Sequence, residues 1–155
     1  MMDKNEYAER VEQMKPRLYR IAYLYVGSEA MALDAVYEAV YRGLVSVPKL
    51  REHAFFETWI TRIVINECKK ILRRSKREQP LETSPEMAEE DFDSLPLKDA
   101  IGKLPQELRE IVILRYYSGF TVADTAEHLC IPQGTVATRQ RRALQLLRLE
   151  LTDEE

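Results

Sequence analysis

The sequence predicts an all-α protein with two small helical domains joined by an acidic linker. Apolar residues recur at steps of three and four along most of the chain, whereas the two-residue alternation of strands is hard to find. The 155 residues include only five glycines and no G-x-G-x-x-G or P-loop pattern, which argues against a nucleotide-binding α/β enzyme. A segment rich in proline and acidic residues then divides the chain near its middle.

This dividing segment is expected at residues 78–97. It contains Pro80, Pro85 and Pro96, many acidic residues and few large apolar side chains. Proline blocks helix formation, and like charges extend a chain that buries little apolar surface. The net charge is +4 over residues 1–80, −6 over residues 81–100 and −1 over residues 101–155. We therefore predict domains at 1–77 and 98–155, connected by a linker at 78–97.

The first two helices of the N-terminal domain are expected before residue 48. One apolar face runs from Tyr7 to Tyr25 and ends at Gly27, with Pro16 predicted to kink or split the helix. Ser28 is a suitable N-cap for the next helix, which is expected to stop before Pro48. The apolar stripe predicted for this second helix consists of Val36, Val40, Leu44 and Val47.

The third helix is expected from about Phe55 to Arg74. Its predicted buried residues are Phe56, Trp59 or Ile60, Ile63, Val64 and Ile71. Six of the nine residues from 69 to 77 are basic. They form either a solvated helix C-terminus that complements the helix dipole or a site that binds phosphates. The aromatic residues Phe55, Phe56 and Trp59 stand just upstream, and most of these rings are expected in the core rather than stacked on bases.

The C-terminal domain has the order of elements of a helix-turn-helix. A short helix through Ile101 precedes one that begins at Pro105 and ends at Gly119. Thr121 to Asp124 is a capping-box pattern that opens another short helix. Cys130 and Ile131 are the predicted turn, and a last helix runs from Pro132 or Gln133 towards Leu151. The core positions of that helix are predicted to be Val136, Ala143, Leu147 and Leu151.

The last helix also carries polar and basic residues near its start: Thr135, Thr138, Arg139, Arg141 and Arg142. One alternative is an unspecialised helical hairpin. The other is DNA contact, because Gly134 leaves the helix N-terminus open to phosphate and Arg139 and Arg142 can reach a groove. We favour DNA contact.

The chain offers no candidate for catalysis, metal binding or a cofactor. Asp34 and Glu38 are one helical turn apart, but no His, Lys or Cys stands at a defined spacing to act with them. Two cysteines and two histidines without a C-x-x-C pattern support neither a disulfide framework nor a zinc site. We expect no enzymatic activity and no small-molecule substrate. The sequence shows no export signal or membrane span, so a cytoplasmic location is expected.

Three stretches resemble the extracytoplasmic-function sigma factors, the small two-domain initiation subunits of bacterial RNA polymerase. They are LYRIAYLYVGSEAMALDAVYEAVYRGL (18–44), FFETWITRIVINECKKILRRSKR (55–77) and LPQELREIVILRYYSGFTVADTAEHLCIPQGTVATRQRRALQLLR (104–148). The resemblance covers nearly the whole chain, in the family's order. It implies core RNA polymerase and promoter DNA as partners, and an anti-sigma factor that covers the polymerase-binding faces.

The resemblance also implies a role for each group of residues. Binding to the clamp helices of the polymerase is assigned to Asp34, Glu38 and Arg42. Capture of unstacked bases of the minus-ten element, with phosphate contacts around it, is assigned to Lys49, Leu50, Arg51, Glu52, His53, Asn66, Lys69, Lys70, Arg73 and Arg74. Major-groove contacts at the minus-thirty-five element are assigned to Gln133, Thr135, Val136, Thr138, Arg139 and Arg142.

Four positions depart from the family pattern. Tyr37 replaces a frequent glutamine, Ala137 a common lysine and Gln140 a usual leucine. Cys130 stands where glycine is usual; a positive φ there would cost about 1 kcal/mol, and we expect its side chain to be a small buried apolar group. The C-terminal domain, with a net charge of −1 over residues 101–155, is expected to bind promoter DNA poorly without polymerase.

Two other functions remain open from the sequence. A stand-alone helix-turn-helix regulator would bind duplex DNA as a dimer. A protein-binding adaptor would show no salt-dependent affinity for DNA.

Overall fold

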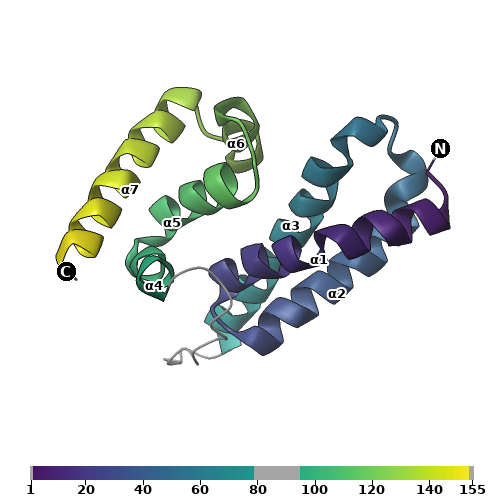
Figure 1. The fold of residues 1–155 in the computed structure, drawn as a ribbon, viewed down its shortest axis with the longest axis horizontal. Coiled ribbons are helices and arrows are strands. Elements are labelled where there is room, and N and C mark those ends of the chain that lie inside the picture. The colour runs from purple at the N-terminus through teal and green to yellow at the C-terminus, as the bar shows by residue number, and fades with distance from the viewer. Residues whose placement is uncertain (1, 79–94, 154–155) are drawn as a thin grey trace. The chain divides into compact units, whose positions relative to one another are not determined.

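The structure is a computed structural model that describes residues 2–78 and 95–153. These residues form α-helices and short helical turns with no strand among them, which confirms the all-α class. The chain divides into two compact units, residues 1–87 and 88–155, referred to below as unit 1 and unit 2 (Figure 1).

Unit 1 is a bundle of three helices, α1 (Lys4–Val26), α2 (Glu29–Ser46) and α3 (Phe56–Glu78), each packed against the other two. Local signals set the helix ends. The Asp3 carboxylate accepts from the Glu6 backbone N–H at 2.8 Å, and Gly27 closes α1 at a φ of 74°. The Ser28 hydroxyl accepts from the Met31 N–H at 3.2 Å and begins α2, as predicted.

The predicted split of α1 at Pro16 is wrong, since α1 continues through this residue as one helix. Pro16 is exposed, whereas Met14 and Leu18 on either side of it are buried. The carbonyl that loses its partner to proline therefore lies on the side that water can reach, and the packing of the opposite side keeps the helix intact.

The prediction of which residues α2 buries is also partly wrong. The buried face consists mainly of small residues: Ala32, Ala35, Val36, Ala39 and Gly43. Leu44, predicted in the core, is 36% exposed. The small residues allow the neighbouring helices to approach closely. The Tyr7 hydroxyl donates to the Val40 carbonyl at 2.6 Å. A Cβ at Gly43 would clash with that hydroxyl and lie 2.9 Å from Ile60 Cδ1.

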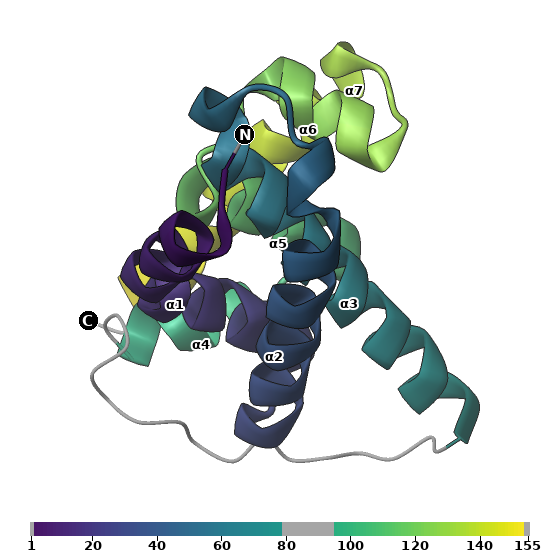
Figure 2. The same cartoon turned by 90° about the vertical axis from the view of Figure 1, so that its right-hand side faces the viewer.

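Two short turns, η1 (Val47–Lys49) and η2 (His53–Phe55), connect α2 to α3. Most of the predicted α3 positions are buried or half-buried, and Phe56 is 1% exposed. Phe55 differs from its neighbour, with 63% of its surface exposed. Both views of the ribbon place this connection beside the start of α1 (Figures 1 and 2).

Unit 2 contains four helices, α4 (Leu95–Lys103), α5 (Gln106–Val112), α6 (Val122–Leu129) and α7 (Gln133–Asp153), and α7 packs against the other three. The helix predicted from Pro105 to Gly119 begins one residue later, because Pro105 is the N-cap, and its second half is a π-helical turn, η3 (Ile113–Tyr117). The backbone N–H and the hydroxyl of Ser118 both donate to the Ile113 carbonyl, at 2.9 and 3.0 Å.

The helix-turn-helix has the predicted cap and turn. The Thr121 hydroxyl accepts from the Asp124 N–H at 2.9 Å, and the Asp124 carboxylate accepts from the Thr121 N–H at 3.2 Å. Cys130 ends α6 at a φ of 60°, so the residue in the usual glycine position does adopt the left-handed conformation. Its side chain is exposed, however, and the expectation of a buried Cys130 is wrong.

The ends of the predicted linker are helical. Glu78 is the last residue of α3, and Leu95 to Leu97 form the start of α4. The rest of the segment, residues 79–94, lies outside the described residues.

Candidate nucleic-acid and protein-binding surfaces

A cationic face of α3 carries half of the residues predicted to meet single-stranded DNA. Asn66, Lys69, Lys70 and Arg73 stand at steps of three and four, on one side of the helix. Another side of the helix is buried through Val64, Ile65 and Cys68, so the cationic face points towards solvent. Asn66, Arg73 and Arg74 are exposed, and Lys69 and Lys70 are partly buried. A rise of about 1.5 Å per residue puts Asn66 about 15 Å and Arg73 about 25 Å from Phe56, so this face spans several nucleotides.

The loop before α3, residues 49–53, carries the other half of the residues predicted to meet single-stranded DNA. Lys49, Arg51 and Glu52 are exposed, and Leu50 and His53 are partly exposed. The backbone is held at both ends, since the Leu50 N–H donates to the Val47 carbonyl and the Phe55 N–H to the Glu52 carbonyl, each at 3.0 Å. The Phe55 ring follows directly and is exposed, so it is accessible for stacking on a base.

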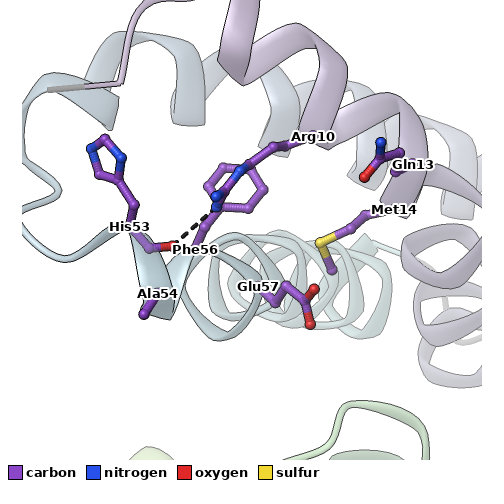
Figure 3. A pocket seen from close by; sticks show the side chains of 7 residues that line it. All are labelled: Arg10, Gln13, Met14, His53, Ala54, Phe56 and Glu57. Carbon is purple, nitrogen blue, oxygen red and sulfur yellow. Dashed lines mark hydrogen bonds between the residues drawn. The ribbon is translucent and has the colours of Figure 1, made fainter.

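A pocket of about 310 Å³ lies where this loop meets α1 (Figure 3). It is lined by Arg10, Gln13, Met14, His53, Ala54, Phe56 and Glu57. One side of the pocket is polar, with the Glu57 carboxylate 3.4 Å from Nη2 of Arg17. The Phe56 ring behind Arg10 is apolar and packs edge-on against Tyr7 with ring centroids 5.9 Å apart.

The exposed face of α2 combines charges with large apolar side chains. Asp34, Glu38 and Arg42, the predicted polymerase-binding residues, stand one turn apart and are all exposed. An adjacent row, the α2 apolar stripe, is formed by Leu33, Tyr37, Tyr41, Leu44 and Val45, which are 36–63% exposed. Exposed apolar rows with a polar border are typical of protein-binding surfaces.

Glu67 of α3 connects the α2 face to the cationic face. Its side chain is only 8% exposed, and Oε2 lies 2.9 Å from Arg42 Nε and 3.2 Å from Lys70 Nζ. Arg42 Nε also lies 3.1 Å from a carboxylate oxygen of Glu38. Two carboxylates thus hold the Nε side of the Arg42 guanidinium. The predicted polymerase residue Arg42 and the predicted phosphate residue Lys70 share one buried acid.

The start of α7 presents most of the residues predicted to read duplex DNA. Gln133, Thr138 and Arg142 are exposed and Thr135 is partly exposed. A Cβ at Gly134 would meet nothing within 4 Å, so the helix N-terminus is open for close approach. Val136 is the exception: it is fully buried in a cluster with Ile111 and Ala126, so its side chain is not available to DNA and belongs to the core.

One ion pair and one hydrogen bond connect α7 to α5 and η3. Arg139 Nη2 lies 3.4 Å from a carboxylate oxygen of Glu107 at the start of α5. Arg115 donates to Gln140 at 2.8 Å and to the carbonyl of Phe120 at 2.6 Å. Gln140 stands between the buried residues Val136 and Ala143 along the helix. The residue in a usual leucine position therefore serves as the acceptor for an arginine from η3.

Sequence reasoning missed Arg10, Glu67 and Arg115. Each is a charged residue on a helix, which favours an ordinary solvated position when only the sequence is known. Their partners from other elements are 25 to 43 residues away in the chain. Within residues 2–78 and 95–153, no helix has the length and apolar character needed to span a bilayer, and no group of three or more His, Cys, Asp or Glu is placed to hold a metal ion.

Comparison with known families matches both halves of the chain. Residues 10–78 match Sigma-70 region 2, and residues 94–147 match Sigma-70, region 4. The chain is 30% identical to the RNA polymerase sigma factor SigV of Bacillus subtilis over 91% of this chain and 88% of that protein. It is 28% identical to the ECF RNA polymerase sigma factor SigW of the same organism over 97% of this chain and 91% of SigW.

Two solved structures have the same fold. The sigma factor RpoE of Bartonella quintana, crystallised with the anti-sigma factor NepR, superposes with a TM-score of 0.82 at 22% identity, over 97% of this chain and 99% of RpoE. CnrH, in complex with the cytosolic domain of CnrY, superposes with a TM-score of 0.71 at 18% identity, over 99% of this chain and 92% of CnrH.

Proposed function

The chain belongs to the extracytoplasmic-function RNA polymerase sigma factors, and from this membership we propose that it binds bacterial core RNA polymerase and directs promoter recognition, DNA melting and transcription initiation. One observation carries the proposal: both halves of the chain match sigma region families, in the family's order. Among the three functions weighed from the sequence, this match favours the sigma factor. The family consists of non-enzymatic initiation factors, so catalysis belongs to the polymerase.

The two units divide the promoter between them. Residues 1–77 would bind core polymerase and the minus-ten element, 78–97 would be the linker, and 98–155 would bind the minus-thirty-five element. The cytoplasm, where polymerase acts, would be the location.

Minus-ten recognition is assigned to the loop at residues 49–53 and to the cationic face of α3. The exposed side chains of the loop would contact unstacked bases, and Lys69, Lys70, Arg73 and Arg74 would contact phosphates. Asn66, about 15 Å along α3 from its first residue, would meet a different nucleotide from the loop.

Minus-thirty-five recognition is assigned to the start of α7. Gln133, Thr135, Thr138, Arg139 and Arg142 would face the major groove, with Val136 omitted because it is buried. Arg139 is held by Glu107 in the free protein, so this contact must open before Arg139 reaches a base.

The exposed face of α2 is assigned to core polymerase. Asp34, Glu38 and Arg42 would supply the charged contacts, and the α2 apolar stripe would supply buried area. An anti-sigma factor would cover the same face, so that anti-sigma and polymerase exclude each other. The complex of RpoE with NepR supports this kind of control by analogy of fold.

The deciding experiment measures binding of the purified chain to sigma-free core polymerase, followed by transcription from a pool of random promoter fragments. Tight binding with selective initiation is expected. Asp34→Arg and Glu38→Arg should each abolish core binding without unfolding the protein, and Glu9→Arg, an exposed substitution on α1, is the matched control. No binding by the folded wild-type chain would refute the proposal.

Arg139→Ala tests the groove assignment. Loss of a base contact should cost about 1 to 3 kcal/mol and relax the preference at one or two positions of the minus-thirty-five element. A uniform loss over all promoter sequences would instead make Arg139 a phosphate contact.

A further inference from the structure

Arg10 connects α1 to the loop that precedes α3, across 43 residues of sequence. Its guanidinium Nη1 donates to the carbonyl oxygen of His53 at 3.0 Å. The same group lies over the Phe56 ring, with Cζ 5.4 Å from the ring centroid. Figure 3 shows both contacts, with the imidazole of His53 directed away from Arg10.

The carbonyl that Arg10 contacts is a structural junction. The His53 oxygen also accepts from the backbone N–H of Phe56, the contact that closes η2 and leads into α3. Two donors from different elements therefore converge on one oxygen. They fix the end of the loop at the point where the chain enters the helix.

Arginine suits this position for two physical reasons. Its planar guanidinium can donate a hydrogen bond in its plane while its face stacks on an aromatic ring. Glu6, one turn earlier on α1, lies 3.8 Å from Arg10 Nε and directs the group further. Phe56 is 1% exposed, so the surface on which the guanidinium rests is part of the core of unit 1.

We propose that Arg10 is a positioning residue for minus-ten recognition: it sets the base preference of the loop by holding the His53 backbone, without contacting the bases itself. The inference rests on the proposed function of the loop. Side chains at residues 49–53 are carried by the backbone that Arg10 holds, and base discrimination needs contact groups held to within about 0.5 Å.

The test compares three variants in complete holoenzyme assembled with sigma-free core polymerase. Arg10→Met removes the donor but keeps a long unbranched side chain over Phe56, and Arg10→Lys restores a donor. Lys15→Met is the matched control, because Lys15 also lies on α1 and its ion pair is with Glu12 of the same helix, at 2.8 Å. Each holoenzyme transcribes a pool of promoters randomised at the minus-ten element, with a fixed minus-thirty-five element.

The measured quantity is the ratio of initiation from preferred to non-preferred minus-ten sequences. Arg10→Met should lower this ratio about tenfold, as expected for the loss of one charge-assisted hydrogen bond. Arg10→Lys should lower it about threefold, because lysine donates without the stacked guanidinium plane. Lys15→Met should leave the ratio unchanged.

Two results would overturn the proposal. One is an unchanged ratio in Arg10→Met with normal core affinity. The other is an equal fall of initiation on every minus-ten sequence, which marks a purely structural role. Should Arg10→Met fail to fold, judged by the fluorescence of Trp59, Arg10→Lys decides by the same ratio. Failure of the wild-type chain to initiate anywhere would refute the proposed sigma function itself, and is visible before any variant is compared.

Discussion

Unit 1 and unit 2 are both helical, but they differ in the length of their helices and in the contacts that supplement the core. Unit 1 consists of helices of 23, 18 and 23 residues that pack over a broad interior. Three helices of unit 2 have only 9, 7 and 8 residues. Isolated helices below about 12 residues are marginal in water. The short helices of unit 2 therefore rely on its buried core together with backbone contacts from Thr121, Ser118 and Arg115. Unit 1 has capped helix ends too, but its long helices pack closely around Gly43 and Tyr7.

The two cysteines provide the largest contrast between the units, because one lies in each. Burial raises the pKa of the Cys68 thiol in α3 to about 12, and the charge of Glu67 adds to this. Cys130 in unit 2 is exposed. At neutral pH, a thiol reagent should modify Cys130 at least about a hundredfold faster than Cys68.

Mass spectrometry of the labelled protein over time measures both rates. Denaturant should bring the two rates together. Fast modification of Cys68 in the folded protein would mean that unit 1 opens readily and is not the more tightly packed unit.

Gly43→Ala should produce the largest loss of stability. The added methyl would meet the Tyr7 hydroxyl and lie 2.9 Å from Ile60 Cδ1, inside the three-helix interface. Overpacking of this kind costs about 1 to 3 kcal/mol. Trp59, the only tryptophan, lies in unit 1, so thermal unfolding followed by its fluorescence reports that unit.

The matched control for Gly43→Ala is Gly102→Ala in α4, where a Cβ would meet nothing within 4 Å. Alanine is the better helix former, so that variant should gain up to about 1 kcal/mol in unit 2. Equal behaviour of the two variants would contradict the assignment of Gly43 to a close helix contact.

Thr121→Ala should have a smaller effect, confined to unit 2. It removes the hydroxyl that accepts from the Asp124 N–H at 2.9 Å and should cost about 1 kcal/mol. Circular dichroism should show an earlier loss of part of the helix signal, while the unfolding temperature reported by Trp59 stays the same. Thr121→Ser keeps the cap and should behave as wild type; a shift in the Trp59 transition would show that the units are not independent.

Cys130→Gly should give the smallest effect, and in the opposite direction. Glycine adopts a φ of 60° without the cost that a side chain carries there, so unit 2 should gain about 1 kcal/mol or less. Cys130→Ala, which keeps a Cβ at the same φ, should show no such gain. Equal stabilisation by both substitutions would show that the thiol, not the backbone, is responsible.

The contrast between the units also explains which features could be predicted from the sequence. The cap at Ser28, the capping box at Thr121 and the turn at Cys130 depend on residues within one turn, and these predictions are confirmed. The buried face of α2 depends on how closely α1 and α3 approach. Its small residues carry little hydrophobic signal, so the larger Leu44 was wrongly preferred for the core.

The candidate surfaces follow the same division. The cationic region of α3 could be predicted because six of the nine residues from 69 to 77 are basic. The contacts between elements could not be predicted. Glu67 and Arg42 come from different helices, and Arg10 of α1 contacts the backbone of His53 in the loop before α3. The exposure of Cys130 and Phe55 likewise depends on tertiary packing, which a single sequence does not contain, whereas the burial of Val136 follows its predicted core spacing.

The shared carboxylate of Glu67 limits how unit 1 can change. Arg42 on the α2 face and Lys70 on the cationic face are bound to the same oxygen atom, so a substitution at either position alters the charge balance of the other. The two surfaces are therefore not separate modules that can be exchanged one at a time. A designer who wishes to transplant a different cationic face onto this bundle must carry Glu67 and Arg42 along with it, or replace all three side chains together.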